Sequence, residues 1–232
     1  MNWRLIPSSF IPPEGQMESD RRLFKAFQPG DKPLLRFFTF DQPTLTLGRL
    51  EANRLDLTRL SFPYEIRPTG GWTVLHGEGD LCYSVTASTD DSLVGGDLLT
   101  SYRKISEILM EGLRVLEVPV ELSPEKPKSS NPAHCFAAPS TWEILLQGKK
   151  VAGGAQAREG KVFHQQGVLL LKVSSQWREA FPSSSLEAMA GLNDGGSSLT
   201  RSSLEEALIR SFQSRGVEFE KALTLSAPSL KL

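Results

Sequence analysis

A stretch near the middle of the chain, residues 97–116, repeats apolar side chains at a helical spacing. The apolar positions are Leu98, Leu99, Tyr102, Ile105, Ile108, Leu109, Leu113 and Leu116. A period close to 3.6 predicts an amphipathic helix, and its length makes it the longest helix expected in the chain. The preceding residues alternate apolar and polar side chains in short runs, which is typical of strands. We therefore expect an α+β fold in which this helix packs across a sheet.

The rest of the chain supplies further strands and two more helices. Strands are expected at 3–7, 34–40, 44–47, 65–67, 73–75, 81–87 and 142–147, with one long strand or a strand pair at 162–173. Residues 44–47 should complete a hairpin with 34–40, and helices are expected at 14–27 and from Ser203 toward Phe212. Proline, serine and charged residues fill 123–132, which predicts a mobile loop and a candidate lid.

Composition narrows the class of protein. At 232 residues one main domain is the default. A formal net charge of −1 lacks the broad positive field that drives nucleic-acid binding, so no nucleic-acid partner is expected. No apolar run approaches a membrane span and the first residues lack a signal-peptide core, which favours a cytoplasmic protein without membrane attachment. Two cysteines and three histidines are too few for a zinc signature, and we expect no metal site.

Cys135 lies fifteen positions before Lys150, with the predicted strand 142–147 between them. This spacing could bring a thiol and an ammonium group to one pocket. A nearby cation lowers the pKa of a cysteine from about 8.5 and makes the thiol a useful nucleophile. The alternatives are an inert buried thiol and a solvated lysine. Cys82, in an alternating strand pattern without a basic neighbour in sequence, is interpreted as a core residue.

Two glycine-containing regions, 69–80 and 153–155, also stand out. Glycine lets the backbone pass close to a ligand, and the freed N–H groups can hold a carboxylate, a thioester oxygen or a phosphate. Neither region fits the dinucleotide-binding fingerprint or the phosphate-binding P-loop. Turn glycines without a function remain the alternative.

In combination and in this order, these segments resemble the lipoate and octanoate transfer family, which contains lipoate-protein ligases, octanoyltransferases and, more distantly, biotin-protein ligases. One pattern of that family is Arg-Arg-x-Ser/Thr-Gly-Gly-x-x-Val-x-His followed by Leu-x-Tyr-Ser, matched by Arg67, Thr69, Gly70, Gly71, Val74, His76, Leu81, Tyr83 and Ser84. A second is Gly-Lys/Arg-Lys-Ile/Val-x-Gly-Ser-Ala-Gln, matched by Gly148, Lys149, Lys150, Val151, Gly153, Ala155 and Gln156. A third, Cys-Phe-x-x-Pro-Ser-x-x-Glu-Leu/Ile, is matched by Cys135, Phe136, Pro139, Ser140, Glu143 and Ile144 and is similar to the cysteine-dependent octanoyltransferases and related amidotransferases.

The resemblance covers about residues 3–173 of a single predicted domain, 1–232, with 174–232 as a C-terminal extension. It implies a biotin/lipoate-ligase-like catalytic domain with a central mixed or antiparallel sheet flanked by helices. The acyl cleft would lie between the Gly70-Gly71 turn and residues 150–156. It further implies that Cys135 is the nucleophile and that Lys150 contacts the acyl carbonyl. The implied substrate-binding residues are Arg67, Gly70, Gly71, His76, Gly153, Gly154, Ala155 and Gln156.

The function implied by the resemblance is transfer of an octanoyl or lipoyl group through a Cys135 thioester to the lysine of a lipoyl domain, without a cofactor. The donor would be octanoyl-acyl carrier protein, and the acceptors would be lipoyl-domain proteins such as 2-oxoacid dehydrogenase subunits or the glycine cleavage H protein. One alternative is an ATP-dependent lipoate-protein ligase that uses lipoate, ATP and Mg. Another is a non-catalytic paralogue that binds an acyl group or a lipoyl domain, and biotin ligation is the least favoured.

Three positions depart from the family pattern. Ile66 stands at the place of the first arginine, Trp72 at a place usually held by a small residue, and Gly154 in place of a serine. Loss of the cation at Ile66 disfavours phosphate binding and hence the ligase. We expect Trp72 to shorten or reshape the acyl channel.

Overall fold

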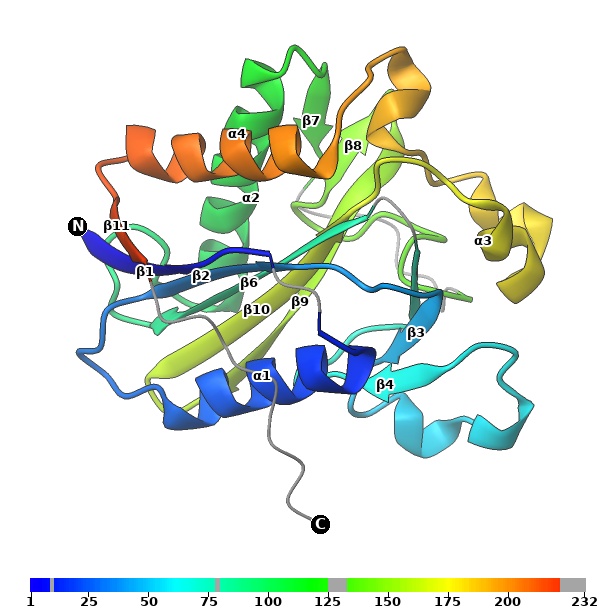
Figure 1. The fold of residues 1–232 in the computed structure, drawn as a ribbon, viewed down its shortest axis with the longest axis horizontal. Coiled ribbons are helices and arrows are strands. Elements are labelled where there is room, and N and C mark those ends of the chain that lie inside the picture. Colours follow the sequence, from blue (N-terminus) through cyan, green and yellow to red (C-terminus); the bar gives the residue numbers. More distant parts are fainter. Residues whose placement is uncertain (9–10, 78–79, 125–132, 222–232) are drawn as a thin grey trace.

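The computed structural model describes residues 1–8, 11–77, 80–124 and 133–221, and an eight-stranded sheet runs through its centre (Figure 1). Its strands are β1 (Asn2–Ile6), β2 (Leu34–Phe38), β6 (Leu81–Ser88), β7 (Val120–Leu122), β8 (Ile144–Leu146), β9 (Lys149–Glu159), β10 (Val162–Leu169) and β11 (Glu218–Lys221). They lie in the order β11-β1-β2-β6-β10-β9-β8-β7. Strand β1 runs parallel to both of its neighbours, and the other pairs are antiparallel. The sheet is therefore mixed, as predicted.

A second, three-stranded sheet contains β3 (Thr44–Leu47), β4 (Tyr64–Ile66) and β5 (Val74–His76) in the order β4-β3-β5. The predicted hairpin between residues 34–40 and 44–47 is therefore wrong. Both edges of β2 are already occupied, by β1 and by β6, so β3 has no place beside it. The chain crosses to the second sheet instead, where β3 pairs with β4 and β5. Because of this crossing, a space lies between the large and the small sheet.

Helices cover both faces of the large sheet (Figure 1). They are α1 (Pro13–Ala26), α2 (Leu98–Val115), α3 (Ser175–Ala180) and α4 (Arg201–Ser214), with short 3-10 turns at Ala52–Arg54, Leu57–Arg59, Ser183–Leu186 and Leu192–Gly195. Helix α2 is the longest described helix, as predicted, and the Asp97 side chain caps it by accepting a hydrogen bond from Thr100 N at 2.8 Å. Helices α2 and α4 lie on one face and α1 lies on the other (Figure 1).

The two faces of the large sheet are packed differently. Under α2 and α4 the core is apolar, with Leu109 of α2 and Phe212 of α4 buried against the sheet. Under α1 a buried polar network joins the apolar contacts: Asp20 pairs with Arg36 at 2.8 Å, and both side chains are buried, while Met17 lies in an apolar cluster with Phe38. Burial alone would raise the pKa of Asp20, but the Arg36 cation and neighbouring donors lower it to about 2. Gln166 of β10 also donates to Asp20, which ties this network to the space between the sheets.

The segment after residue 173 joins the same architecture. Backbone bonds run from Lys150 N to Ala188 O at 2.8 Å and from Ala190 N to Lys150 O at 3.0 Å. Further along, α4 packs against α2, and β11 pairs with β1 at the edge of the sheet. The residues beyond 173 thus complete the sheet and fix the backbone of Lys150.

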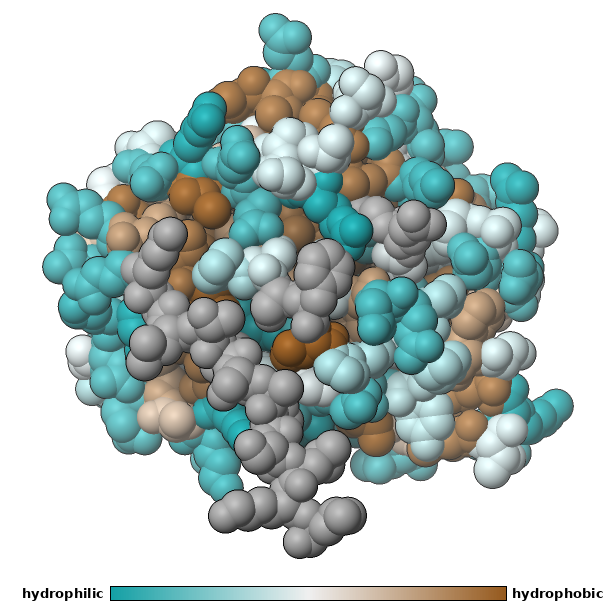
Figure 2. Space-filling model, viewed as in Figure 1, coloured by the Kyte–Doolittle hydropathy of each residue, from teal (hydrophilic) through white to brown (hydrophobic). Residues whose placement is uncertain are grey.

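The described helices give no sign of a membrane span. None of them combines the length and the apolar composition that crossing a bilayer requires. Figure 2 shows hydrophilic side chains over much of the described surface on one face, with apolar side chains in separate groups.

Candidate active site

A narrow cavity lies between the large and the small sheet. Its volume is about 40 Å³, which leaves room for only a few water molecules. Strands of both sheets, helix α1 and the Cys135 loop contribute to it. Its walls are Met17, Phe38, Thr46, Arg67, Gly71, Val74, His76, Cys82, Cys135, Gly153, Gly154, Ala155, Gln166, Gly167 and Val168.

Cys135 lies on a loop that three contacts hold in place. Its own N–H donates to Thr73 O at 2.9 Å. The preceding His134 is buried, accepts a hydrogen bond from Phe136 N through Nδ1 at 3.2 Å, and lies 3.0 Å from Ser185 Oγ through Nε2. Burial, assisted by the Lys150 charge, lowers the pKa of His134 to about 4, so this ring is neutral near pH 7. His134 therefore anchors the loop without contributing charge.

Lys150 reaches Cys135 because a tight hairpin sets its position. Gln147 and Gly148 have positive φ values of 50° and 75°, the pattern of a two-residue turn whose twist matches the strands. The turn pairs Leu145 with Lys150 across β8 and β9. Lys150 is 1% exposed, and its Nζ lies 3.3 Å from Cys135 Sγ and 2.5 Å from Cys135 O. The structure thus brings together the thiol and the cation that the sequence analysis paired.

Glu143 completes this arrangement. Its Oε1 accepts a hydrogen bond from Lys150 Nζ at 2.6 Å, and its Oε2 accepts one from Ser140 N. Burial opposes the charge on Lys150, but the contacts with Cys135 and Glu143 outweigh burial and raise the pKa of Lys150 above its usual value. The ammonium also lies 4.8 Å from the centre of the Phe136 ring. Lys150 is therefore a buried cation held by three acceptors and an aromatic face.

Gly153 makes room for this ion pair. A Cβ at Gly153 would come within 2.7 Å of Lys150 Nζ and 2.9 Å of Glu143 Oε1. Gly154 faces a different obstacle, since a Cβ there would come within 2.7 Å of Gln166 O. The serine common at this place in the family pattern would collide with that backbone. Gly153, Gly154 and Ala155 all line the cavity, and they do so from the middle of a strand instead of a turn.

Arg67 holds the glycine turn of the opposite wall. Its guanidinium donates to Thr46 O at 2.6 Å, to Gly70 O at 2.8 Å and to Trp72 O at 3.0 Å. Gly71 follows with φ +86°, and a Cβ there would lie 3.3 Å from Ala155 Cβ. Both the backbone conformation and the close approach therefore favour glycine at this position. Gly70, in contrast, does not line the cavity, and a Cβ there would meet nothing within 4 Å.

His76 and Cys82 form a neutral pair on the cavity wall. His76 stacks on Phe40, its Nε2 lies 2.8 Å from Thr46 Oγ1 and its Nδ1 lies 3.3 Å from Cys82 Sγ. Burial, with the Arg67 charge, lowers the pKa of His76 to about 3. Burial also raises the pKa of Cys82 well above its usual value. Neither group is a charged catalyst near pH 7.

The structure does not place three residues as the sequence analysis expected: Gln156, Trp72 and Ile66. The Gln156 side chain donates to Ser101 Oγ at 3.0 Å and Gln165 Oε1 at 2.7 Å, on the α2 side of the sheet, and it does not line the cavity. Trp72 is 38% exposed and does not line the cavity either, so it does not shorten this channel. The carbonyl of Ile66 accepts a hydrogen bond from Arg21 Nη1 of α1 at 2.9 Å, which places another cation near this position.

Sequence reasoning did not assign several residues of the site, Glu143, Met17 and Gln166 among them. Glu143 was part of a matched pattern but was not assigned to the site, although it lies within the predicted strand 142–147, whose hairpin partner carries Lys150. Met17 of α1 and Gln166 of β10 also line the cavity. Their sequence contexts are those of ordinary helix and strand residues, so no local signal distinguishes them. The predicted lid at 123–132 lies mostly outside the described residues.

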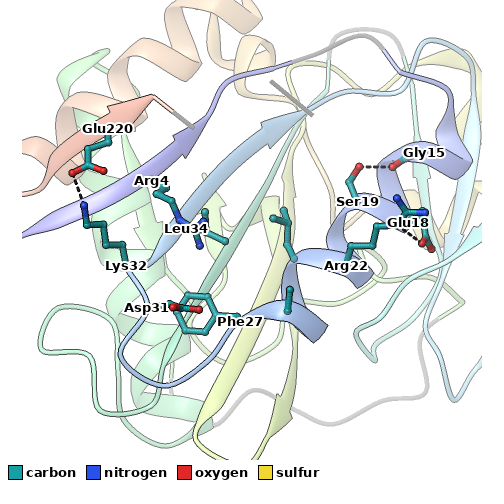
Figure 3. A pocket seen from close by; sticks show the side chains of 12 residues that line it. Arg4, Gly15, Glu18, Ser19, Arg22, Phe27, Asp31, Lys32, Leu34 and Glu220 are labelled. Atoms are coloured by element: carbon teal, nitrogen blue, oxygen red, sulfur yellow. Dashed lines mark hydrogen bonds and ion pairs between the residues drawn. The ribbon is translucent and has the colours of Figure 1, made fainter. Parts of the chain in front are cut away.

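A second, wider hollow lies beside α1, where residues of β1, β2 and β11 complete its walls (Figure 3). We call it the α1 groove; its volume is about 570 Å³ and its walls are Arg4, Gly15, Glu18, Ser19, Arg22, Leu23, Ala26, Phe27, Asp31, Lys32, Leu34 and Glu220. Lys32 and Glu220 form an ion pair at 2.6 Å across one end, and Glu18 pairs with Arg22 at the other (Figure 3). The described part of the chain contains no group of three or more histidine, cysteine or acidic side chains arranged to bind a metal.

Comparisons with known sequences identify related proteins. The family model "Lipoyl protein ligase A/B catalytic domain" matches residues 12–213. Octanoyltransferase LipM of Carboxydothermus hydrogenoformans is 37% identical over 177 residues, which cover 74% of this chain but only 65% of that protein. Octanoyltransferase LipM of Kyrpidia tusciae is 32% identical over 235 residues, which cover 90% of this chain and 85% of that protein. Against the first of these relatives, the chain therefore spans just under two thirds of the protein's length.

Solved structures show the same architecture. A structure described as lipoate-protein ligase A bound with ATP has a TM-score of 0.78 and 25% identity, covering 97% of this chain and 90% of its own. A bi-partite lipoate protein ligase studied with its E2 lipoyl domain, from Thermoplasma acidophilum, has a TM-score of 0.73 and 22% identity, covering 97% and 88%. The matched family model spans most of the chain, and the biotin/lipoate-ligase-like α+β fold is as predicted. The chain belongs to the lipoyl protein ligase A/B catalytic domain family.

Proposed function

We propose that this chain is an acyltransferase that moves an octanoyl or lipoyl group through a thioester on Cys135 to the lysine amine of a lipoyl domain. The observation that carries the proposal is the distance of 3.3 Å between Cys135 Sγ and Lys150 Nζ. Cys135 lines the narrow, partly apolar cavity, and Lys150 lies beside it. The names of the relatives, octanoyltransferases, support the same reaction class.

In the first transfer the Cys135 thiolate attacks the carbonyl carbon of an acyl thioester. A new carbon–sulfur bond forms, and the carbonyl oxygen becomes an oxyanion. The Lys150 N–H that points at Cys135 Sγ lies where it can turn to this oxygen. Collapse of the intermediate breaks the donor's carbon–sulfur bond, and the donor leaves as a thiolate that takes up a proton. Charge stabilisation of this kind is usually the largest single contribution to acyl transfer.

In the second transfer the neutral lysine amine of the acceptor attacks the acyl-enzyme carbonyl. A carbon–nitrogen bond forms, and a second oxyanion develops beside Lys150. The bond between the acyl carbon and Cys135 Sγ then breaks, which regenerates the thiolate. The acceptor nitrogen gives up one proton to solvent as the amide forms.

The alternative function is ATP-dependent ligation of lipoate, which one structural neighbour with bound ATP illustrates. Two observations disfavour it. Arg67, the cation at the glycine turn, already donates to three backbone carbonyls. Ile66 stands where the family pattern has a second arginine. An adenylate-forming site needs cations for phosphate oxygens, and this pair of positions supplies none.

The proposal extends to partners and context. We propose octanoyl-acyl carrier protein as donor and lipoyl-domain proteins as acceptors, either 2-oxoacid dehydrogenase subunits or the glycine cleavage H protein. The reaction as written needs no nucleotide and no metal. We also propose that residues 1–232 form one catalytic domain, since β1 and β11 belong to the same sheet. The proposed setting is the cytoplasm, without a nucleic-acid or membrane partner.

The test is intact-protein mass spectrometry after incubation with octanoyl-acyl carrier protein without ATP. The native chain should gain a hydroxylamine-labile octanoyl group that peptide mapping places on Cys135. Cys135→Ala should gain none, and Lys150→Met, which keeps length but removes charge, should acylate at least a hundredfold more slowly. A Cys135→Ala protein that modifies a lipoyl domain at the native rate would exclude the thioester route.

A separate incubation with lipoate, ATP and Mg checks the alternative. Modification of a lipoyl domain under these conditions, together with no adduct from octanoyl-acyl carrier protein, would make the protein a ligase. Binding of a lipoyl domain without turnover in either incubation would make it a non-catalytic paralogue.

A further inference from the structure

Besides Cys135, Glu143 is a second group beside Lys150 that can carry a negative charge. Lys150 has three N–H groups, and they have three acceptors: Cys135 O, Cys135 Sγ and Glu143 Oε1. Both Lys150 and Glu143 are buried, with side chains 1% and 3% exposed. Two groups that can be anionic therefore share one buried cation.

The charge balance changes during the proposed reaction. While Cys135 is a thiolate, it and Glu143 both neutralise Lys150. Once the sulfur carries an acyl group it is neutral, and among the described residues Glu143 is then the only carboxylate in ion-pair contact with Lys150. A buried amine without a counterion loses its proton, because burial disfavours the charged form. A neutral amine would stabilise the second oxyanion poorly.

The Glu143 carboxylate is fixed independently of Lys150. Its second oxygen accepts the Ser140 N–H. Its backbone N–H donates to Ser123 Oγ at 2.9 Å, and its backbone carbonyl accepts from Ser123 N at 2.8 Å. Glycine at position 153 leaves room for the carboxylate, because a Cβ there would come within 2.9 Å of Glu143 Oε1. The carboxylate thus stays beside Lys150 whether or not Cys135 is charged.

We propose that Glu143 is a positioning residue that keeps Lys150 an ammonium while Cys135 is acylated, and so supports the second acyl transfer more than the first. In the free enzyme the carboxylate competes with the thiolate for Lys150. Removing its charge therefore has opposite effects on the two halves of the reaction. This inference rests on the proposed transferase function.

The test compares native protein with Glu143→Gln in two measurements. The first is the rate of Cys135 alkylation by iodoacetamide at pH 7, which reports thiolate. The second is a chase in which the octanoyl-enzyme, formed from octanoyl-acyl carrier protein, is mixed with a lipoyl domain and the loss of the adduct is followed by mass spectrometry. We expect Glu143→Gln to be alkylated at least as fast as native protein and to lose the acyl group at least tenfold more slowly.

Glu121→Gln is the matched control, because Glu121 is an exposed carboxylate on β7 and has no contact with the site. It should behave as native in both measurements.

Equal slowing of alkylation and chase in Glu143→Gln would show a merely structural role and overturn the inference, as would an unchanged chase. If Glu143→Gln does not fold, Glu143→Asp carries the same test, since it retracts the carboxylate from Lys150; a chase slowed with alkylation preserved supports the inference, and parallel slowing overturns it. Failure of native protein to form the adduct would instead contradict the transferase function itself.

Discussion

The cavity beside Cys135 and the α1 groove differ in both size and chemistry. The groove is more than ten times larger, about 570 Å³ against about 40 Å³, yet its charges lie at the surface, and Lys32 and Glu220 are each about half exposed. The cavity is small, but Lys150 and Glu143 beside it are almost fully buried. Exposed ion pairs contribute little and form readily, whereas buried ones persist only where their partners are held in place. In this comparison the smaller space, with the buried charges beside Cys135, is the reactive one.

The small volume also has a consequence for binding. An eight-carbon chain cannot enter a space that holds only a few waters unless a wall moves. Met17 of α1 is the wall residue suited to such a movement, because an unbranched thioether side chain can adopt many conformations. The groove needs no such movement. Substitutions beside the cavity should therefore affect activity more than substitutions in the groove.

Gly153→Ala should damage the cavity most. The new Cβ would press on Lys150 and Glu143, displacing the ammonium from Cys135. We expect acylation by octanoyl-acyl carrier protein to slow by about a hundredfold, since small misplacements of catalytic groups have effects of this size. The rate of adduct formation measures it. Gly70→Ala is the matched control, because a Cβ there meets nothing within 4 Å; equal losses in both variants would contradict the steric argument.

His76 should make cavity stability sensitive to acid. Its pKa is about 3 when folded and about 6.5 in an unfolded chain, so the unfolded state binds more protons between these values. Stability from the neutral ring is present above pH 6.5 and is lost as the pH falls. Relative to His76→Gln, native protein should lose about 2 kcal/mol of unfolding free energy between pH 7.5 and pH 5. Urea denaturation at each pH measures this difference. If the difference in unfolding free energy between the two proteins stays constant down to pH 5, His76 becomes protonated in the folded protein and the prediction is wrong. Between pH 7.5 and 8.5 this difference should stay constant in either case.

Substitutions in the α1 groove should have the smallest effect. Lys32→Ala removes an exposed ion pair that is worth about 0–1 kcal/mol. We expect acyl transfer to a lipoyl domain to stay within about twofold of native, and the thermal midpoint to change little. Initial rates at several acceptor concentrations provide the measurement. A fivefold or larger rise in KM for the acceptor would show that the groove takes part in acceptor binding, which would contradict the difference between the cavity and the groove.

The sequence predicts where helices and strands lie better than it predicts which strands pair with one another. Periodicity located α2 and the strand at residues 81–87 because each has a long, regular pattern. It failed for residues 44–47, whose partners β4 and β5 were settled by competition for the edges of β2. Strand β11 was not expected at all, because four residues with little apolar pattern become a strand only through pairing with β1.

The residues of the site also differ in how well the local sequence predicts their positions. Cys135 and Lys150 could be paired from their spacing around one strand, because a short hairpin sets the position of Lys150 and the loop before that strand carries Cys135. Gln156 was assigned to the cavity by its place in a pattern, yet alternation along β9 turns its side chain toward α2. Met17 comes from an element more than a hundred residues away, and nothing in its local sequence distinguishes it from an ordinary helix residue. Contacts between distant elements are what the local pattern does not contain.

The placement of β1 in the sheet has a consequence for how the protein is made. Its partner β11 follows it by 216 positions (218 − 2), so a newly synthesised chain holds β1 with one edge unpaired until β11 has been made. Such an edge can pair with a strand of another chain. Closing so long a loop is also slow compared with forming the local hairpins β8–β9 and β9–β10. The last step of folding is therefore expected at the edge of the sheet farthest from the reactive lysine, after the hairpin that carries Lys150 has formed.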